Sequence, residues 1–223
     1  MKKVLSLVAL LGALAGTASA APYYMPTPAG GALTPYDWQP VYSIDGVYSI
    51  SDRDSAPDTC GARLGFSLYS SGIGSVRHQF TILAGYEEGT EHSSFDIGEE
   101  IAKYDVDLYR IPLTLGYDIN LGLTDNVFID LGVKAGYAWG SVESKVKEAG
   151  AYTGYSTREH LGGFTFGLGA GVKVQCSDAI YVKLGYEFNR TYFGKVGGGD
   201  FEGIGRSMNY GSHSIVLSVG CLF

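Results

Sequence analysis

The sequence contains few of the residues on which metal and redox sites are built. Its 223 residues include three cysteines and four histidines, and Cys60, Cys176 and Cys221 show no CxxC motif and no histidine at metal-ligand spacing. An odd cysteine count without such spacing argues against a zinc or redox site, so we expect no metal and no cofactor. A disulfide between Cys176 and Cys221 would be allowed in an oxidising compartment. Three free, apolar thiols are the simpler expectation.

Basic residues are scarce as well. The chain has 16 Lys and Arg against 23 Asp and Glu, and without Lys2 and Lys3 its formal charge is −9. An acidic chain argues against a nucleic-acid partner, because phosphate binding needs a basic face. A nucleotide-binding loop is not indicated either, since the glycine run 197–199 is followed by Asp200 and not by Lys and Ser or Thr.

The chain begins with an apolar run that is too short to span a membrane. Lys2 and Lys3 precede the apolar stretch from Val4 to Ala15, and Ala18-Ser19-Ala20 follows it. These features predict a secretory signal peptide, residues 1–20, cleaved after Ala20. The residue directly after that site is Ala21 and not cysteine, so a lipid anchor is not indicated. Residues 21–40 hold five of the seven prolines and no apolar periodicity, which predicts an extended linker.

From residue 41 onward, apolar residues alternate with small or polar ones. A period of two is typical of β-strands, whereas an amphipathic helix needs a period near 3.6. The clearest case is 127–140, where Val127, Ile129, Leu131 and Val133 share one side. The alternation predicts eight strands, at residues 41–50, 62–70, 78–87, 103–119, 127–140, 161–175, 180–189 and 211–223.

The connections between these strands alternate in length. Those at 51–61, 88–102, 141–160 and 190–210 have 11, 15, 20 and 21 residues, and those at 71–77, 120–126 and 176–179 have 7, 7 and 4. Long loops on one side and short turns on the other are typical of outer-membrane barrels. Pro112 lies inside the fourth segment, and because proline cannot donate to a ladder we expect a local break in pairing there.

The ionic side chains of the predicted strands share one face. Charge facing lipid at mid-bilayer costs about 2–4 kcal/mol for Lys or Arg, so the charged face is expected inside. The lumen of an eight-stranded barrel is just wide enough for side chains to fill, which predicts an ion-paired interior with little or no open pore. The predicted lumen residues are four acidic and four basic: Asp45, Arg63, Asp118, Asp130, Lys134, Lys173, Lys183 and Glu187.

Several aromatic residues share the opposite, apolar face. Aromatic girdles mark the two interfaces of membrane barrels, although β-proteins favour tyrosine in general. Because these residues have a common parity, we interpret them as membrane-interface aromatics: Tyr42, Tyr48, Tyr86, Tyr117, Tyr137, Trp139, Tyr186 and Phe223.

The segment IPLTLGYDI at 111–119 and the terminal SIVLSVGCLF carry a resemblance. Over 41–223 the chain resembles the small eight-stranded outer-membrane β-barrels, including opacity-type adhesins, although Cys221 and Leu222 depart from the more aromatic ending of that family. The resemblance implies an all-β, antiparallel, up-and-down transmembrane barrel in the bacterial outer membrane, surrounded by its lipid, with a periplasmic linker at 21–40. It also implies that the barrel-assembly machinery recognises the C-terminal strand.

The resemblance further implies a structural role, or surface contact and adhesion through loops 141–160 and 190–210. The mixed charge and tyrosines of 141–160 suit protein contact, and they equally suit a solvated hairpin extension of the flanking strands. We therefore expect a barrel that is not an enzyme.

Two other functions are compatible with parts of the sequence. Ser212, His213 and Ser214, with Glu187 or Glu202, could compose a catalytic set of a lipid-modifying enzyme similar to a lipid A deacylase. A soluble, lipocalin-like ligand carrier would instead turn the Val127 to Val133 row toward a central cavity.

Overall fold

The computed structural model describes residues 38–52, 56–70, 76–97, 100–148, 151–195 and 208–222. The predicted signal peptide, nearly all of the predicted linker, Glu202 and Phe223 lie outside these ranges. Within them, no helix is long and apolar enough to cross a membrane. The strands are β1 (Trp38–Ser51), β2 (Thr59–Ser70), β3 (Val76–Ile97), β4 (Glu100–Gly122), β5 (Val127–Glu148), β6 (Ala151–Gln175), β7 (Ile180–Lys195) and β8 (Met208–Leu222).

The eight strands form one closed barrel in which neighbours along the chain are paired. Every pair is antiparallel, and β1 closes the ring by pairing with β8 from Val41 opposite Leu222 to Ser51 opposite Ser212. The predicted eight-stranded, antiparallel, up-and-down barrel is therefore confirmed. Trp38 already belongs to β1, so this strand begins three residues before the predicted start at residue 41.

The alternation in sequence separates an outer from an inner surface. In β5, Leu131 and Val133 are 46% and 52% exposed, whereas the carboxylate-bearing Asp130 is 1% exposed. The apolar row therefore faces outward and the charged row faces the lumen. A lipocalin-like carrier needs the reverse orientation, so the observed one excludes that alternative.

The strands are staggered around the ring. Starting at Ile50 of β1 and following paired residues through His213, Phe188 and the remaining strands leads back to Pro40, ten residues lower on β1. Strand number and stagger together set strand tilt and barrel width. Each strand is thus offset from the next by slightly more than one residue, and side chains from adjacent strands interleave in depth.

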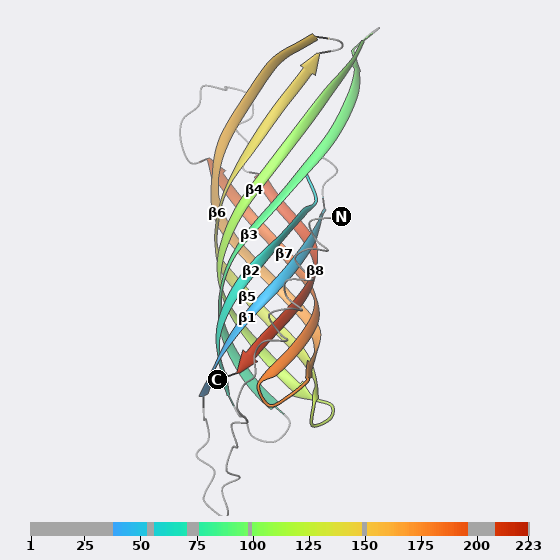
Figure 1. Ribbon diagram of the computed structural model, residues 1–223. Helices are drawn as coiled ribbons and strands as arrows, with labels where there is room; N and C mark the ends of the chain where they lie inside the picture. The colour runs from blue at the N-terminus through green and yellow to red at the C-terminus, as the bar shows by residue number, and fades with distance from the viewer. Residues whose placement is uncertain are drawn as a thin grey trace, which may run out of the picture.

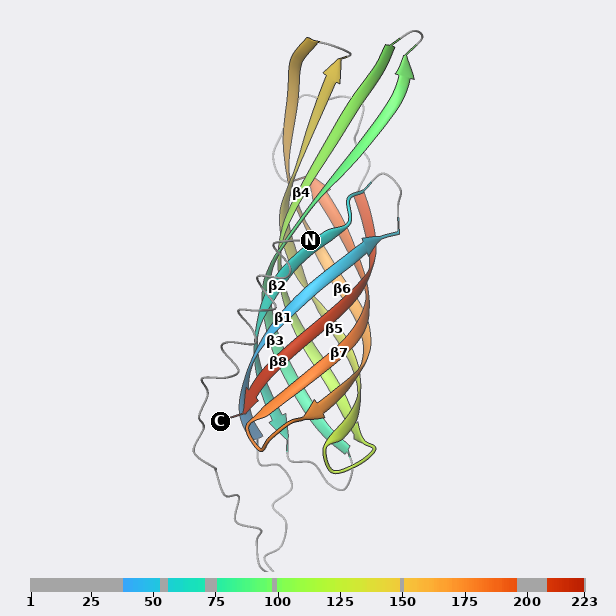
Figure 2. The same cartoon turned by 45° about the vertical axis from the view of Figure 1, so that its right-hand side comes forward.

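Strands β3–β6 are much longer than the other four. They have 22 to 25 residues, and β1, β2, β7 and β8 have 12 to 16. Their extra length projects from one end of the barrel, as Figures 1 and 2 show. The short connections 123–126 and 176–179 lie at the opposite end, where backbone amides of Val127 and Ile180 donate to the hydroxyls of Thr124 and Ser177 at 3.1 Å.

The prediction of loops at 88–102 and 141–160 was therefore wrong. Ser93 pairs with Tyr104, and Val146 pairs with Tyr155, so both segments continue the strands as hairpins. For 141–160, the alternative of a hairpin extension is the correct one. The apolar alternation stops beyond residue 87 because the outer face there is polar, but backbone pairing does not depend on that alternation.

The expected break at Pro112 is confirmed. Pairing between β3 and β4 runs up to Ala84 opposite Leu113, is interrupted, and resumes in the same register at Glu87 opposite Arg110. On its other side Pro112 still lies opposite Ala138 of β5. The proline thus interrupts one ladder without shifting either strand.

Candidate functional site: the lumen and the outer rim

Five charged side chains form an outer ionic cluster in the upper part of the lumen. Glu87, which is 0% exposed, accepts hydrogen bonds from Arg63 Nη2 at 2.9 Å and from Arg110 Nε at 2.8 Å. Arg63 Nη1 also reaches Glu187 at 2.8 Å, and Glu187 pairs with Lys134. One arginine therefore bridges the buried carboxylate of Glu87 on β3 and the partly buried carboxylate of Glu187 on β7.

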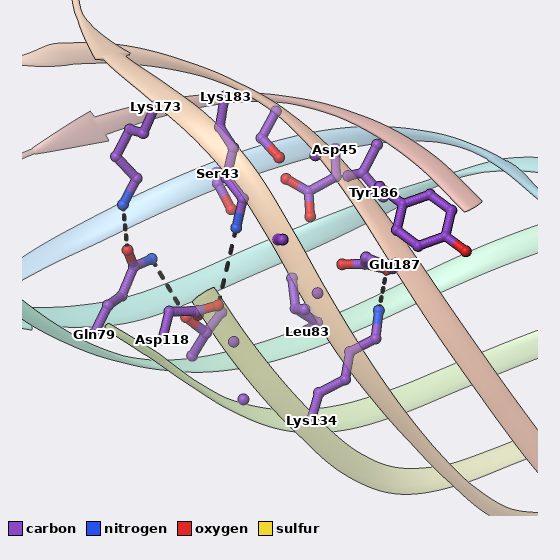
Figure 3. Close-up of a pocket in the computed structure, with 18 of the residues that line it drawn as sticks. Ser43, Asp45, Gln79, Leu83, Asp118, Lys134, Lys173, Lys183, Tyr186 and Glu187 are labelled. Carbon is purple, nitrogen blue, oxygen red and sulfur yellow. Dashed lines mark hydrogen bonds and ion pairs between the residues drawn. The ribbon is translucent and has the colours of Figure 1, made fainter. Parts of the chain in front are cut away.

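Four charged side chains form an inner ionic cluster nearer the short turns. Lys183 pairs with Asp130 and lies 3.9 Å from Asp118, and Lys173 Nζ lies 3.8 Å from Asp130. Lys173 also donates to Gln79 Oε1 at 2.6 Å. Figure 3 shows Lys173 pointing toward Gln79 and Lys183 pointing toward Asp118 in the lumen.

All eight predicted lumen residues face the interior, and the two clusters bring seven of them together. The eighth, Asp45, is 6% exposed and is hydrogen-bonded by the side chain of Ser218; within the described ranges it makes no ion pair. Glu87 and Arg110 were missing from the predicted set. Their parity along the predicted strands 78–87 and 103–119 already places them on the inner face, so the same rule applied to every charged residue would have found them.

Apolar side chains lie above and below the ionic clusters. Ala56, Leu108, Ala138, Leu161, Phe193 and Tyr210 form a buried cluster at the outer end, which we call the outer cap. Tyr210 donates to the carbonyl of Pro57 at 3.3 Å, and Arg110 lies 5.0 Å from its ring centroid. At the opposite end, Val41, Tyr69 and Tyr181 pack together with Leu222.

A cavity of about 50 Å³ lies in the lumen between the two ionic clusters. Its lining includes Asp45, Asp118 and Lys134, together with glycines from four strands. A space of this size holds a few water molecules, since one water needs about 10–15 Å³. This cavity is consequently a small, partly polar space between lumen side chains.

The predicted interface aromatics that the structure describes all lie in outward rows. Tyr42, Tyr48, Tyr86, Trp139 and Tyr186 are 47% to 55% exposed, and Tyr117 and Tyr137 are partly exposed. Ring contacts join Tyr137 to Trp139 at 4.9 Å near the outer end, and Phe80 to Tyr117 at 4.9 Å near the other.

The structure separates the residues of the suggested catalytic set. Ser212 and Ser214 are 0% exposed and face the lumen, whereas His213 between them faces outward and hydrogen-bonds through Nδ1 with the Tyr186 hydroxyl. Neighbours in a strand point to opposite faces, so neither serine can use His213 as a base. This set therefore forms no triad.

The described residues offer no alternative built on a metal or a disulfide. Among them, no three His, Cys, Asp or Glu side chains gather where a metal ion could be held. Cys60, Cys176 and Cys221 are all free thiols, so the suggested bond between Cys176 and Cys221 is not formed.

The projecting ends of β3–β6 form a four-stranded sheet, which we call the outer sheet. It consists of residues 89–97, 100–108, 142–148 and 151–160. Its outward face is polar: Asp107 accepts hydrogen bonds from Thr90 at 2.8 Å and from Lys145 at 3.0 Å, and His92 contacts Asp105 at 3.0 Å. Partial burial raises the pKa of Asp107, but the two hydrogen bonds and the lysine charge outweigh it and hold that pKa below its usual value. Along the same strands, the outward residues are therefore apolar within the barrel and polar in the outer sheet.

An outward-facing apolar belt, aromatic residues at its two ends and a charged interior define a transmembrane β-barrel. Comparison with family models matches residues 5–223 to the outer membrane protein beta-barrel domain. The chain belongs to this family, and the protein resides in the bacterial outer membrane. A search of curated proteins finds no match.

A search of solved structures finds similar chains, among them three bacterial proteins. Neisserial surface protein A is 18% identical, with 83% of this chain and 97% of that one covered and a TM-score of 0.46. Ail, the attachment invasion locus protein of Yersinia pestis, is 11% identical, with 85% and 99% covered and a TM-score of 0.42. The N-terminal barrel of Pseudomonas aeruginosa OprF is 16% identical, with 84% and 100% covered and a TM-score of 0.39.

Proposed function

We propose that this outer-membrane barrel is not an enzyme and that it makes contact with a protein outside the cell through the outer sheet. The observation that carries the proposal is the length of β3–β6, which extends six or more residues beyond the longest of the other strands. A barrel needs only enough strand to cross the membrane, about 9–11 residues. The additional paired length therefore serves a purpose outside the bilayer.

The edges of the outer sheet support contact with a protein. Pairing of β3 with β2 ends at Glu88, and pairing of β6 with β7 begins at Leu161, so in the described registers residues 89–97 and 151–160 each pair on one side. A strand with one unpaired edge presents backbone donors and acceptors to which another chain can add. The predicted contact segment 141–160 is part of this sheet, and 190–210 lies mostly outside the described residues.

We also infer that the lumen does not conduct solutes. Packed side chains occupy successive depths of the interior. From the outer end these are the outer cap, the two ionic clusters and the apolar group of Val41, Tyr69 and Tyr181. An eight-stranded barrel has room for little besides its own side chains. Planar-bilayer recordings should show no stepwise conductance, and openings of regular size in the wild-type protein would contradict a closed lumen.

The outward row of β8 suits recognition by the barrel-assembly machinery. Ile215, Leu217, Val219 and Cys221 form a continuous apolar row that ends at the chain terminus. Weakening this row, for example with Val219→Lys, should slow insertion of newly made chains. Insertion at the wild-type rate would argue against the role of β8.

Register-guided shortening of the outer sheet tests the surface function. One variant removes residues 93–104 and joins His92 to Asp105 through Asn-Gly, and a second removes 146–155 and joins Lys145 to Ser156 likewise; both joined pairs are opposite one another. Asn-Gly is favoured in two-residue hairpins, so the barrel should close normally. Bacteria carrying both deletions should lose attachment to host cells or to one another.

Two measurements make that test decisive. Heat-modifiable gel migration and surface protease accessibility report whether each variant is folded and displayed. A control with two glycines inserted in the turn 123–126 changes only the opposite end. Wild-type attachment by a folded, displayed double deletion would reject the contact function and leave a structural role.

A further inference from the structure

Two basic side chains face outward where the lipid-facing surface ends. Arg190 occupies the outward row of β7 between Phe188 and Tyr192, and in the register it lies opposite Phe166 of β6. His213 lies opposite Phe188, in the outward row of β8. Both residues are therefore surrounded by aromatic side chains on the outer surface of the barrel.

The stagger of the strands fixes the depth of Arg190. The stagger offsets each strand from its neighbour by slightly more than one residue along the barrel axis. When this offset is taken into account, Arg190 lies at the same depth, to within about one residue, as three outward residues of other strands: Ile50, Phe164 and Trp139. One outward position further from the membrane, Ser141 follows Trp139 on β5 and Asp52 follows Ile50 at the end of β1, and on β7 Tyr192 follows Arg190. Arg190 is thus at the boundary where lipid headgroups begin.

Arg190 has no acidic partner in the described part of the chain. Among the described residues no carboxylate lies within ion-pair distance of it and its buried Nε makes no hydrogen bond, and its Cζ lies 5.9 Å from the Tyr192 ring centroid. The carboxylate of Asp52 covers Gly211, which pairs with Arg190, and it accepts a hydrogen bond from the Gly211 amide at 3.2 Å without forming an ion pair with Arg190. A guanidinium at the edge of hydrocarbon is costly without an anion, so an external anion is favoured there.

The neighbouring aromatic residues hold the site in shape. Phe166 and Tyr192 stack with ring centroids 6.0 Å apart. His213 packs on Phe188 at 5.3 Å, and its Nδ1 is engaged by the Tyr186 hydroxyl, which fixes the ring. Acidic residues lie at the same rim next to β8: the Asp52 carboxylate covers Gly211, and Asp58 accepts a hydrogen bond from the Ser51 amide of β1 at 2.9 Å.

We propose that Arg190, assisted by His213, binds the phosphate group of a lipid headgroup in the outer leaflet. A guanidinium matches the geometry of a phosphate and donates two parallel hydrogen bonds to it. Phe166, Phe188 and Tyr192 lie at the depth where aromatic rings contact the first acyl carbons and the headgroup. The site is independent of the outer sheet and of the contact function proposed for it.

Native mass spectrometry of the full-length barrel in detergent micelles tests this site. Phosphatidic acid, phosphatidylcholine with the same acyl chains, and inorganic phosphate are added in separate titrations. Phosphatidic acid should bind more tightly than phosphatidylcholine, and Arg190→Gln should weaken it about tenfold, since a charge-assisted phosphate contact is lost. Arg190→Lys should retain part of the affinity, and Asp52→Asn should raise it by removing a nearby negative charge.

Lys145→Gln is the matched control, because Lys145 is basic and outward but lies beyond the headgroups and pairs with Asp107. Its lipid binding should equal that of the wild type. Heat-modifiable migration confirms that each variant is folded. If Arg190→Gln does not fold, the affinities of the other two variants for phosphatidic acid test the proposal, because Arg190→Lys should lower this affinity and Asp52→Asn should raise it. Equal affinity of wild type and Arg190→Gln, equal binding of the two lipids, or equally tight binding of free phosphate would overturn the proposal.

Discussion

Strands β3–β6 pass through two surroundings, and comparing them shows what each part of the sequence specifies. Within the membrane every strand has two neighbours, and outward residues such as Leu113 and Val133 are apolar. In the outer sheet the same ladders continue, but the outward residues are polar, such as Thr90 and Lys145, and two edges are unpaired on one side. The backbone pairing is common to both regions. The regions differ in their outward side chains, which are apolar where lipid surrounds the strand and polar where water does.

The two regions also differ in what stabilises them. The barrel buries a charged interior, in which Glu87 alone holds two arginines, and it has no free edge. The outer sheet relies on hydrogen-bonded ladders and exposed ion pairs, which contribute little each. We therefore expect perturbations of the barrel interior to cost most and perturbations of the outer sheet to cost least.

The largest effect is expected for Glu87→Gln. This change leaves Arg63 and Arg110 buried with less than their full charge compensation, and breaking such a buried pair costs about 3–5 kcal/mol. Urea unfolding of the purified barrel in lipid vesicles measures the loss. The neighbouring Glu88→Gln, on the partly exposed outward row, should change stability by less than about 0.5 kcal/mol. Equal effects of the two would show that the interior network is not stabilising.

The next effect compares one substitution in both regions. Val133→Arg places a charge on the lipid-facing row near mid-membrane and should cost about 2–4 kcal/mol. Thr90→Arg places the same side chain on the hydrated outer sheet, where about 0.5 kcal/mol or less is expected. The same vesicle unfolding assay applies. If Val133→Arg were as mild as Thr90→Arg, the outer surface at residue 133 would not meet lipid.

The smallest effect concerns pH and the outer sheet alone. Because the folded-state pKa of Asp107 is lowered, its contribution is fully present above the ordinary aspartate pKa of about 3.9 and is lost as pH falls through the lower folded value. Hydrogen exchange of amides near Thr90 and Lys145 should accelerate below about pH 4. In Asp107→Asn this acid-dependent step should disappear, and its persistence would assign it to another group.

The sequence predicted the barrel well where hydrophobic alternation exists and poorly where it ends. Parity placed Asp130 inside and Leu131 outside because lipid on one face and a filled lumen on the other impose the same rule on every strand. Beyond Glu87 the outward face is polar, the apolar alternation that identified the strand stops, and residues 88–102 were mistaken for a loop. Their pairing, such as Thr90 opposite Asp107, is specified by hairpin register and not by hydrophobicity.

The ionic clusters could be predicted only in part for a related reason. Parity identifies which charges face inward, but which of them meet depends on the stagger around the ring, and this follows from the complete register. Arg63 joins Glu187 although 124 residues separate them in sequence. Glu87 and Arg110 lie within the predicted strands 78–87 and 103–119 on the inward parity, and they were left out of the predicted set of charged lumen residues although that parity includes them.

The Arg63–Glu187 pair also constrains how the barrel is assembled. It joins β2 to β7 across the seam between β1 and β8, where the hydroxyls of Ser49 and Ser214 also meet at 2.7 Å. Before the seam forms, a curved open sheet carries these charges on its concave side without their partners, and that side must stay wet. Closure and charge neutralisation are therefore one event, and a chain that entered the bilayer as an unsealed sheet would have to bring water with it.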